Sequence, residues 1–171
     1  KAKEDGGVDQ PVRLGVISDT HIPQPAKTIP PIVYQLFSGV ALILHAGDLT
    51  TDDVIVQLEA IAPVYAVHGN VDPPDLVRRL PKKREIHVGG VRIGLIHGDG
   101  PGRSTPERAL AAFPGADCVV FGHSHIPVCR REGKTLLFNP GSATDKRREE
   151  RCSVGILTVA GGVVDGEIIR F

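Results

Sequence analysis

The chain has 171 residues, enough for one well-buried domain and too few for two ordinary ones. Hydrophobic residues make up 41% of it, and its 20 basic and 20 acidic residues cancel, so the composition offers no basic surface for stable nucleic-acid binding. Three cysteines without paired metal-ligand spacing fit a reduced, cytoplasmic protein, and no apolar run reaches the roughly 20 residues needed to span a membrane. We expect residues 1–11 to form a flexible tail and residues 12–171 to form a single domain.

The first predicted strand runs from Val12 to Ile17 and is followed by Ser-Asp-Thr-His. Asp19 and His21 therefore lie just beyond the last pleat, where two ligands on one turn can share a metal ion. The pattern Asp-x-His is weak by itself, and an ordinary turn with a capping Asp is the alternative. Residues 22–31 contain four prolines and are predicted to be a loop, followed by a short helix over residues 32–37.

The segment from Leu42 to Asp48 is an apolar run that stops at a glycine and a carboxylate. Such a run is typical of a buried parallel strand, and it places Asp48 at the carboxyl end, where open α/β sheets bind their ligands. Taken alone, this position favours a role for Asp48 as a helix cap. A metal-binding role becomes the better interpretation because the same pattern, an apolar strand followed by a polar group able to bind metal, occurs four more times. It recurs at Asp19 and His21, at Asn70, at His97, and at His123 and His125.

A helix is predicted over residues 52–61, with Thr as its cap and an apolar face formed by Val54, Ile55, Leu58 and Ile61. The next strand, residues 63–67, leads into His-Gly-Asn-Val-Asp. His45 and His68 each precede a Gly-Asp or Gly-Asn pair, and we interpret them as supporting or packing histidines rather than ligands. The Pro-rich, basic segment 75–84 is predicted to be a solvated loop.

The second half of the chain is predicted to be rich in hairpins. Residues 85–88 and 91–96 flank a Gly-Gly turn, and the second of these strands leads to His97. A helix over residues 104–113, with Thr105 as its cap and Pro106 at its first position, precedes a strand over 117–121 that ends in Gly-His-Ser-His. His123 and His125 point in different directions and could contact two neighbouring metal ions. Two further hairpins are expected, 128–131 with 135–138 and 153–159 with 163–170, and the charge run 146–151 is expected to be solvated.

Taken in order, five motifs resemble those of the calcineurin-like metallophosphoesterases: Asp19-x-His21, Gly47-Asp48, Gly69-Asn70-x-Asp72, His97-Gly98 and Gly122-His123-x-His125. The resemblance is closest to the small single-domain phosphodiesterases that carry Asn-Pro-Gly-Ser, here residues 139–142, after the double-histidine motif. It covers nearly the whole chain from Val12. It implies an α/β fold in which two mixed β-sheets pack as a sandwich flanked by helices, which agrees with the alternating βα start and the β-rich finish.

The resemblance also implies two divalent metal ions. The first would be held by Asp19, His21, Asp48 and His125, and the second by Asp48, Asn70, His97 and His123, with Asp48 as the bridge. Two cations about 3.5 to 4 Å apart neutralise phosphate oxygens and provide a hydroxide at neutral pH, as phosphoester hydrolysis requires. Mixed oxygen and nitrogen ligands without thiolate suit manganese, with nickel, zinc, iron and cobalt as alternatives. We therefore expect hydrolysis of a small phosphodiester or nucleotide by attack of a metal-bound hydroxide. Catalytic roles are expected for Asp48, Asn70 and Asp72, and contacts behind the metals or to substrate for His45, His68, Asn139 and Ser142.

One position departs from the wider family. Many members have His directly after the motif's Asn, where it can protonate the leaving group, whereas this chain has Val71. Val71 cannot donate a proton, so efficient hydrolysis of poor leaving groups is not expected. Asp72 is a candidate substitute, but a role as a turn or supporting carboxylate carries at least equal weight.

A scaffold is the alternative to an enzyme. The segment Asp19-Thr-His-Ile-Pro and the Pro-rich loop after it also resemble the small retromer subunit, which uses this fold to bind protein partners and has lost part of the metal site. All the family's ligand positions are filled here, which favours the enzyme. The expected partner is a small phosphodiester or nucleotide, without a membrane and without stable nucleic-acid binding, and a homo-oligomer stays open.

Overall fold

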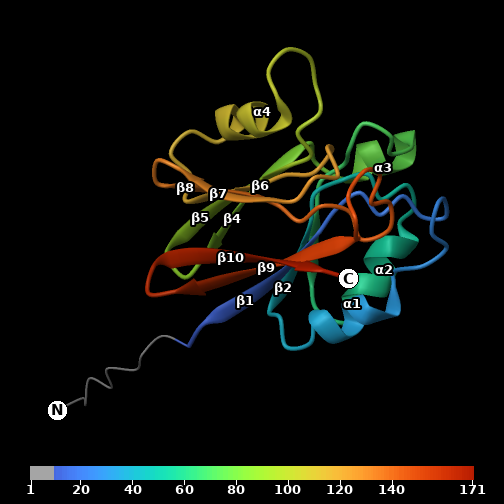
Figure 1. Cartoon of the computed structure of the whole chain (residues 1–171), viewed down its shortest axis with the longest axis horizontal. Coiled ribbons are helices and arrows are strands. Elements are labelled where there is room, and N and C mark those ends of the chain that lie inside the picture. Colours follow the sequence, from blue (N-terminus) through green and yellow to red (C-terminus); the bar gives the residue numbers. More distant parts are fainter. Residues whose placement is uncertain (1–9) are drawn as a thin grey trace.

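The structure is a computed structural model that describes residues 10–171, so the tail expected at residues 1–11 lies almost entirely outside the described residues. Two five-stranded sheets form two layers (Figure 1). The first sheet has the order β10 (Val163–Arg170), β9 (Ser153–Ala160), β1 (Val12–Ile17), β2 (Leu42–His45), β3 (Val64–Ala66). The second has the order β4 (Lys83–Val88), β5 (Val91–Ile96), β6 (Cys118–Val120), β8 (Thr135–Asn139), β7 (Val128–Glu132). Both sheets mix parallel and antiparallel pairs, which confirms the predicted α/β sandwich.

Helices cover the outer faces of the sandwich. The helices α1 (Pro31–Leu36) and α2 (Asp53–Glu59) pack on the first sheet, and α4 (Thr105–Ala112) packs on the second (Figure 1). Alternation along β2 explains why both faces are apolar: Ile43 packs under the helices, whereas Leu44 points into the core between the sheets. The strand is buried on both sides, so its sequence is a continuous apolar run. No described helix is long and apolar enough to cross a membrane.

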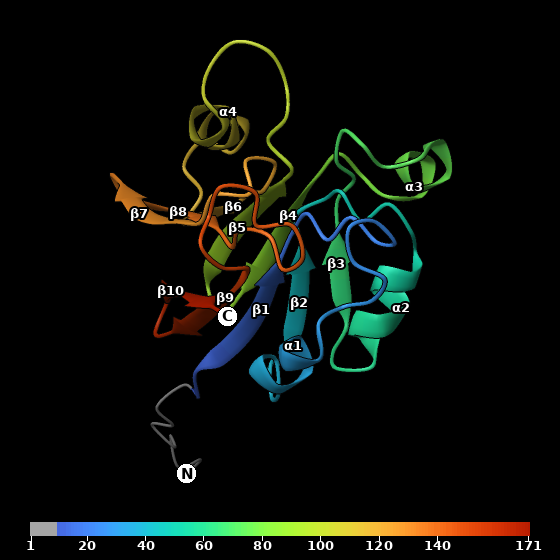
Figure 2. The same cartoon turned by 45° about the vertical axis from the view of Figure 1, so that its right-hand side comes forward.

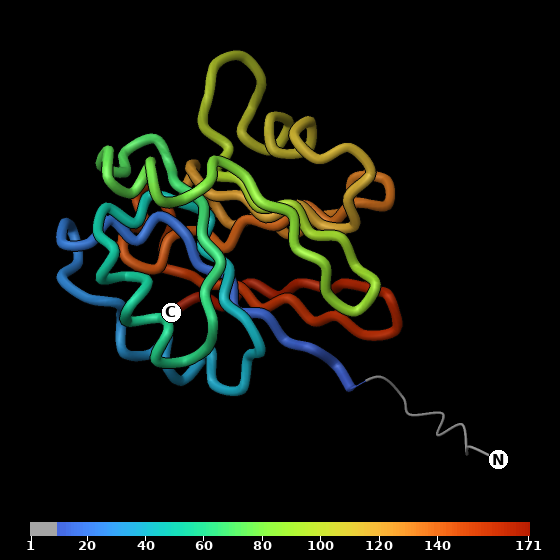
Figure 3. Tube along the Cα trace, turned by 180° about the vertical axis from the view of Figure 1, so that it is seen from behind, coloured from blue at the N-terminus to red at the C-terminus, as the bar shows by residue number. Residues whose placement is uncertain are grey.

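Parallel pairing brings the strand ends that carry polar residues to one edge of the sandwich. In the first sheet β1, β2 and β3 are parallel neighbours, and in the second β5, β6 and β8 are. The loops that follow β1, β2 and β3 lie near one another beyond the arrowheads of these strands in Figure 2. At the opposite end of the sandwich, the turns of the β4–β5 and β9–β10 hairpins lie side by side (Figure 3), where the Gly89 turn approaches Val159.

Three local predictions need correction. The segment 75–84 is not a loop throughout, because helix α3 (Pro74–Arg79) and the start of β4 occupy most of it. Proline at its first position, an acid in its first turn and two arginines in its last turn favour this helix, and Leu76 anchors it in the core. The N-cap of α4 is Ser104, whose hydroxyl accepts from the Glu107 N–H at 3.4 Å, so Thr105 is the first helical residue rather than the cap. Asp52, not Thr, is the N-cap residue of α2.

The hairpins are as predicted, within a residue or two of the expected bounds. Gly89 and Gly90 have φ angles of 53° and 77°, the left-handed conformation that a two-residue turn between antiparallel strands requires at both positions. The pairs β7–β8 and β9–β10 are antiparallel as expected.

Candidate metal centre

Every candidate ligand is carried by a loop that follows a strand, and the loops meet at one edge of the sandwich. Asp19 and His21 follow β1, Asp48 follows β2, Asn70 follows β3, His97 follows β5, and His123 and His125 follow β6. Backbone hydrogen bonds tie the loops together: the Asp19 N–H donates to the Gly47 carbonyl at 3.0 Å, and the Gly122 N–H to the His97 carbonyl at 3.0 Å. Between the sheets, the His123 N–H donates to Asp19 Oδ2 at 3.0 Å, and His97 Nδ1 lies 2.7 Å from the Ala46 carbonyl. The two sheets therefore contribute ligands to a single site.

The backbone of these loops is held in an unfavourable conformation. Five of the candidate ligands have positive φ angles, between 43° and 70°: Asp19, His21, Asp48, His123 and His125. A residue other than glycine held there costs roughly 1–3 kcal/mol and persists only where the surrounding structure fixes it, which happens most often at functional sites. Asp19 and Asp48 are also packed against glycines, because a Cβ on Gly122 or Gly69 would overlap the respective carboxylate.

The first group of ligand atoms belongs to Asp19, His21 and His125. The Asp19 Oδ1 atom lies 3.8 Å from His21 Nε2 and 3.4 Å from His125 Nε2. All three atoms are buried, and none has a hydrogen-bond partner among the described residues. Two ligands held about 2.1 Å from one ion are roughly 3.0–3.4 Å apart, so this spacing needs only a small contraction around a divalent cation. Buried, unpartnered acceptors facing one another fit such a cation well.

The second group is built around His97 and Asn70. The His97 Nε2 atom lies 3.1 Å from Asp48 Oδ2 and 3.0 Å from Asn70 Oδ1, and the same amide oxygen lies 3.2 Å from His123 Nδ1. Asp48 Oδ2 also lies 3.7 Å from His21 Nε2, so its carboxylate is within reach of both groups. Asp19 Oδ1 lies 3.9 Å from His97 Nε2, and Asp19, Asp48 and His97 together form a second set of ligand atoms close enough to hold one ion. Asp19 therefore lies within reach of both groups, whereas the predicted ligand sets placed it on the first metal only.

The electrostatics of the centre suit a bound cation. Burial works against ionisation of Asp19, but the nearby imidazoles of His125 and His21, at 3.4 and 3.8 Å, hold its pKa far below the ordinary value. The pKa of Asp48 is likewise lowered against burial, mainly by the His97 hydrogen bond. His97 shows the reverse: burial opposes its charge, yet Asp48 and Asp19 raise its pKa to about 9. Two buried carboxylates thus draw positive charge to the site, and metal ions would have to displace the proton that His97 carries.

Backbone carbonyls orient two of the histidines. His97 Nδ1 lies 2.7 Å from the Ala46 carbonyl, and His125 Nδ1 lies 2.6 Å from the Asp145 carbonyl. Because a carbonyl only accepts, each Nδ1 must carry the proton and donate it, which leaves Nε2 unprotonated in the neutral ring and free to bind metal. Sequence reasoning missed both contacts, since the acceptors are main-chain atoms without a side-chain signature.

His45, interpreted from the sequence as a supporting or packing histidine, lies behind the ligand loops. Its ring is fully buried, Nδ1 accepts from the Gly47 N–H at 3.1 Å, and Nε2 lies 3.1 Å from the Thr20 hydroxyl. Burial lowers the pKa of His45 to about 3, so the ring is neutral at pH 7 and connects the Asp19 and Asp48 loops. His68 differs: it is half-buried, and its side chain makes no hydrogen bond or ion pair with any described residue.

Asp72 joins the Asp48 loop to the Asn70 loop. Its Oδ2 accepts from the N–H groups of Asp48 at 3.0 Å and Gly69 at 2.7 Å, and its Oδ1 accepts from Thr50 at 2.7 Å. Both oxygens are thus engaged as acceptors and the side chain is buried. These contacts do not favour the catalytic role expected for Asp72; they are those of a residue that positions Asp48 and Asn70.

Asn139 and Ser142 brace the loops of the first group. The Asn139 amide donates to the Gly122 carbonyl at 3.1 Å and to the Ser124 hydroxyl at 3.2 Å. The Ser142 hydroxyl donates to the Asp19 carbonyl at 2.8 Å and accepts from the Asp145 N–H at 2.8 Å. Both residues are buried, so they hold the ligand loops rather than face a substrate.

Comparison with known proteins places this centre in a family. The model of the calcineurin-like phosphoesterase superfamily domain matches residues 12–162. A probable metallophosphoesterase of Methanothermobacter thermautotrophicus is 43% identical over 159 residues, which cover 92% of this chain and 91% of that protein. The chain therefore belongs to the calcineurin-like phosphoesterase superfamily, whose members are metal-dependent phosphoester hydrolases.

Solved structures share the fold at lower identity. Vacuolar Protein Sorting 29 from Cryptosporidium parvum has a TM-score of 0.74 at 23% identity, covering 95% of this chain and 99% of that one. Wild-type Vps29 from Entamoeba histolytica, solved in complex with zinc, has a TM-score of 0.71 at 24% identity, covering 93% and 99%. At this level of identity the likeness shows the fold alone.

Proposed function

We propose that this protein is a dinuclear metal-dependent phosphodiesterase. The observation that carries the proposal is a pair of adjoining ligand groups, Asp19–His21–His125 and Asp19–Asp48–His97. The first has three buried and unpartnered ligand atoms, and Asp48 Oδ2 lies 3.7 Å from His21 Nε2 and 3.1 Å from His97 Nε2, within reach of both groups. Two divalent cations bound here would supply the positive charge that stabilises the phosphate oxygens and would lower the pKa of the attacking water.

The proposed ligands fall into two sets with one shared residue. One cation would be held by Asp19, His21 and His125, and the other by Asn70, His97 and His123. Asp48 would bridge the two cations. Asn70 is exposed, so the second site is open toward substrate. Nitrogen and oxygen ligands without thiolate favour manganese, with zinc, nickel, iron and cobalt as alternatives. A Vps29 of the same fold is described in complex with zinc, which supports zinc among them.

The residue after Asn70 determines which esters are favoured. Val71 is 48% exposed at the mouth of the centre, and its N–H donates to Asp48 Oδ1 at 3.0 Å. Its side chain cannot protonate a departing alkoxide. Diesters with stable leaving groups, such as aryl esters, are therefore the preferred synthetic substrates.

Metal analysis and turnover test the proposal together. Protein stripped with EDTA and reconstituted with manganese should contain two equivalents per chain and hydrolyse bis(p-nitrophenyl) phosphate. Asp48→Asn should lower the occupancy of both sites at once and abolish turnover. Asp165→Asn, on exposed β10, is the matched control and should behave as wild type. One equivalent or none in the wild type would end the dinuclear proposal.

A protein-binding scaffold is the second candidate, favoured by the similarity of the whole fold to Vps29. It differs from the first in one measurable respect. A scaffold that retains the centre would bind metal but hydrolyse no member of a panel of aryl diesters, alkyl diesters, cyclic nucleotides and dinucleotides.

A further inference from the structure

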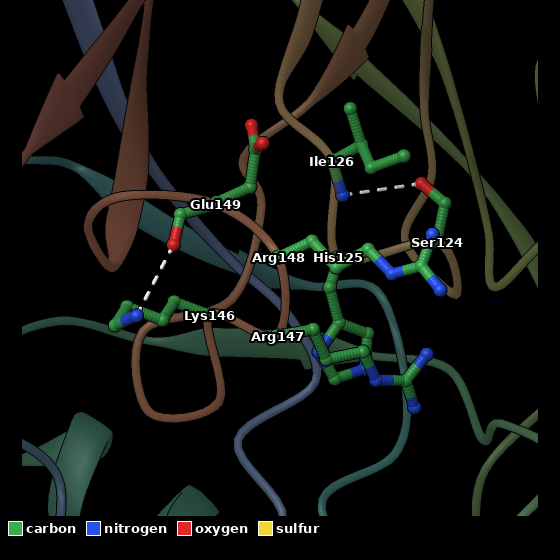
Figure 4. Close-up of a pocket in the computed structure, with 7 residues that line it drawn as sticks. All are labelled: Ser124, His125, Ile126, Lys146, Arg147, Arg148 and Glu149. Carbon is green, nitrogen blue, oxygen red and sulfur yellow. Dashed lines mark hydrogen bonds between the residues drawn. The ribbon is translucent and has the colours of Figure 1, made fainter.

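A cavity of about 410 Å³ opens directly beside the candidate metal centre. It lies between the turn that carries His125 and the loop of residues 146–149, as Figure 4 shows. His125 itself forms part of the wall, so a ligand in the cavity would lie next to one held at the metals. The volume falls within the range of pockets that bind small organic ligands. The other lining residues are Ser124, Ile126, Lys146, Arg147, Arg148 and Glu149.

The cationic groups of this cavity are largely uncommitted. Lys146 donates only to the Glu149 backbone carbonyl, at 3.2 Å. The Arg147 guanidinium lies 4.0 Å from Asp145, at the limit of an ion pair between two partly exposed groups. Arg148 makes no hydrogen bond or ion pair with the described residues. Figure 4 shows both guanidinium groups extending to the side on which His125 lies. Free guanidinium groups match phosphate oxygens in geometry and charge.

The basic loop is held in place relative to the metal centre. The Asp145 carbonyl accepts from His125 Nδ1, and the Asp145 N–H donates to Ser142, which in turn donates to the Asp19 carbonyl. Arg147 has a φ angle of 46°. Of the described residues, the other non-glycine ones at positive φ are Thr50 and the five candidate ligands Asp19, His21, Asp48, His123 and His125. The strained backbone that marks the centre therefore extends to Arg147.

We propose that this cavity binds a second anionic group of the substrate, namely a terminal phosphate on one ester arm of the phosphodiester. Arg147 and Arg148 bind that phosphate, and Ile126, which is 54% exposed, contacts the apolar part of the same arm. The inference rests on the proposed phosphodiesterase activity and narrows its substrate class to diesters that carry a nearby phosphate monoester, such as 5′-phosphorylated dinucleotides.

Two thymidine dinucleotides that differ only in a 5′-phosphate, pTpT and TpT, provide the test. The wild-type manganese protein should hydrolyse pTpT with kcat/KM about 10-fold or more above that of TpT, since a charge-assisted hydrogen bond contributes at least about this factor. Arg147→Gln and Arg148→Gln should each reduce the preference, and the double variant should abolish it. Arg130→Gln, on β7 and outside the cavity, is the matched control and should keep it.

A binding measurement separates the two proposals. Phosphorothioate-linked analogues of pTpT and TpT resist hydrolysis, and calorimetry on the metal-loaded protein should give the same 10-fold preference and the same loss in the double variant. Equal affinity for the two analogues, or a preference that survives in the double variant, would overturn the assignment of the cavity. A preference that depends on Arg147 and Arg148 in a protein that hydrolyses no diester would support the cavity and overturn the phosphodiesterase.

Discussion

Replacing Asp72 with Asn tests whether this residue positions the metal loops or donates a proton. Asn has the same shape but keeps only one of the two acceptor oxygens, so at least one of the three N–H groups from Asp48, Gly69 and Thr50 would face an amide NH₂. Hydrogen bonds to a charged group contribute about 1.5–3 kcal/mol each, and the site is buried. We expect Asp72→Asn to lower the free energy of unfolding by about 2–4 kcal/mol, measured by urea denaturation in EDTA. The protein should stay folded, because the free energy of unfolding of natural domains is roughly 5–15 kcal/mol.

Kinetics with two classes of diester complete the test. A positioning role predicts that Asp72→Asn lowers kcat/KM for aryl and alkyl diesters by the same factor, because both substrates need the same metal geometry. If Asp72 were a general acid, the substitution would lower kcat/KM for alkyl diesters selectively, by about 10²–10⁴, and would leave kcat/KM for aryl diesters nearly unchanged. Asp165→Asn, whose exposed ion pair with Arg131 contributes little, is the control and should change stability by no more than about 1 kcal/mol. Unchanged stability or a selective loss for alkyl diesters would refute the positioning role of Asp72.

Three further results are expected. Val71→His should raise turnover of alkyl diesters more than of aryl diesters, since it places an imidazole beside Asn70; wild-type protein that hydrolyses both classes at similar rates would show that another acid is present. His123→Ala and His125→Ala should each leave one metal site partly occupied while abolishing turnover, as elemental analysis and activity would show; full activity in either variant contradicts the assignment. His45 has a folded-state pKa of about 3 against 6.5 when unfolded, so between these values only the unfolded chain takes up the proton and stability falls as the pH falls. The free energy of unfolding, measured by urea denaturation, should fall by up to about 1.4 kcal/mol per pH unit between pH 7 and 4 in the wild type, and less steeply in His45→Gln. The same slope in both proteins would exclude the buried neutral ring of His45 as the cause.

Repeated sequence patterns predicted which side chains meet at the candidate site, whereas contacts made by main-chain atoms could not be predicted from the sequence. Apolar strands that stop at Gly-Asp, Gly-Asn or His-Gly were sufficient to predict which residues meet at one edge, because parallel strands share a direction. Helix α3 was missed because its prolines read as loop residues, although one of them occupies the first helical position. The carbonyl that orients His97 belongs to a residue 51 positions away, and the partners of the Asp72 carboxylate are backbone amides. Such contacts carry no side-chain signature and require the folded chain.

The left-handed conformation of the ligand residues places stability and metal binding in opposition. At Asp19, Asp48 or His125, glycine would adopt the same backbone angles without strain, and it would also remove part of a cluster of buried charges. A chain that no longer needs its cations would lose this backbone strain on such a substitution, whereas at Asp19 or Asp48 it would also lose the acceptor of the His123 or Val71 N–H group. A sandwich that has lost such ligand residues would therefore be free of their backbone strain and would keep its core and its loops as a surface for other molecules.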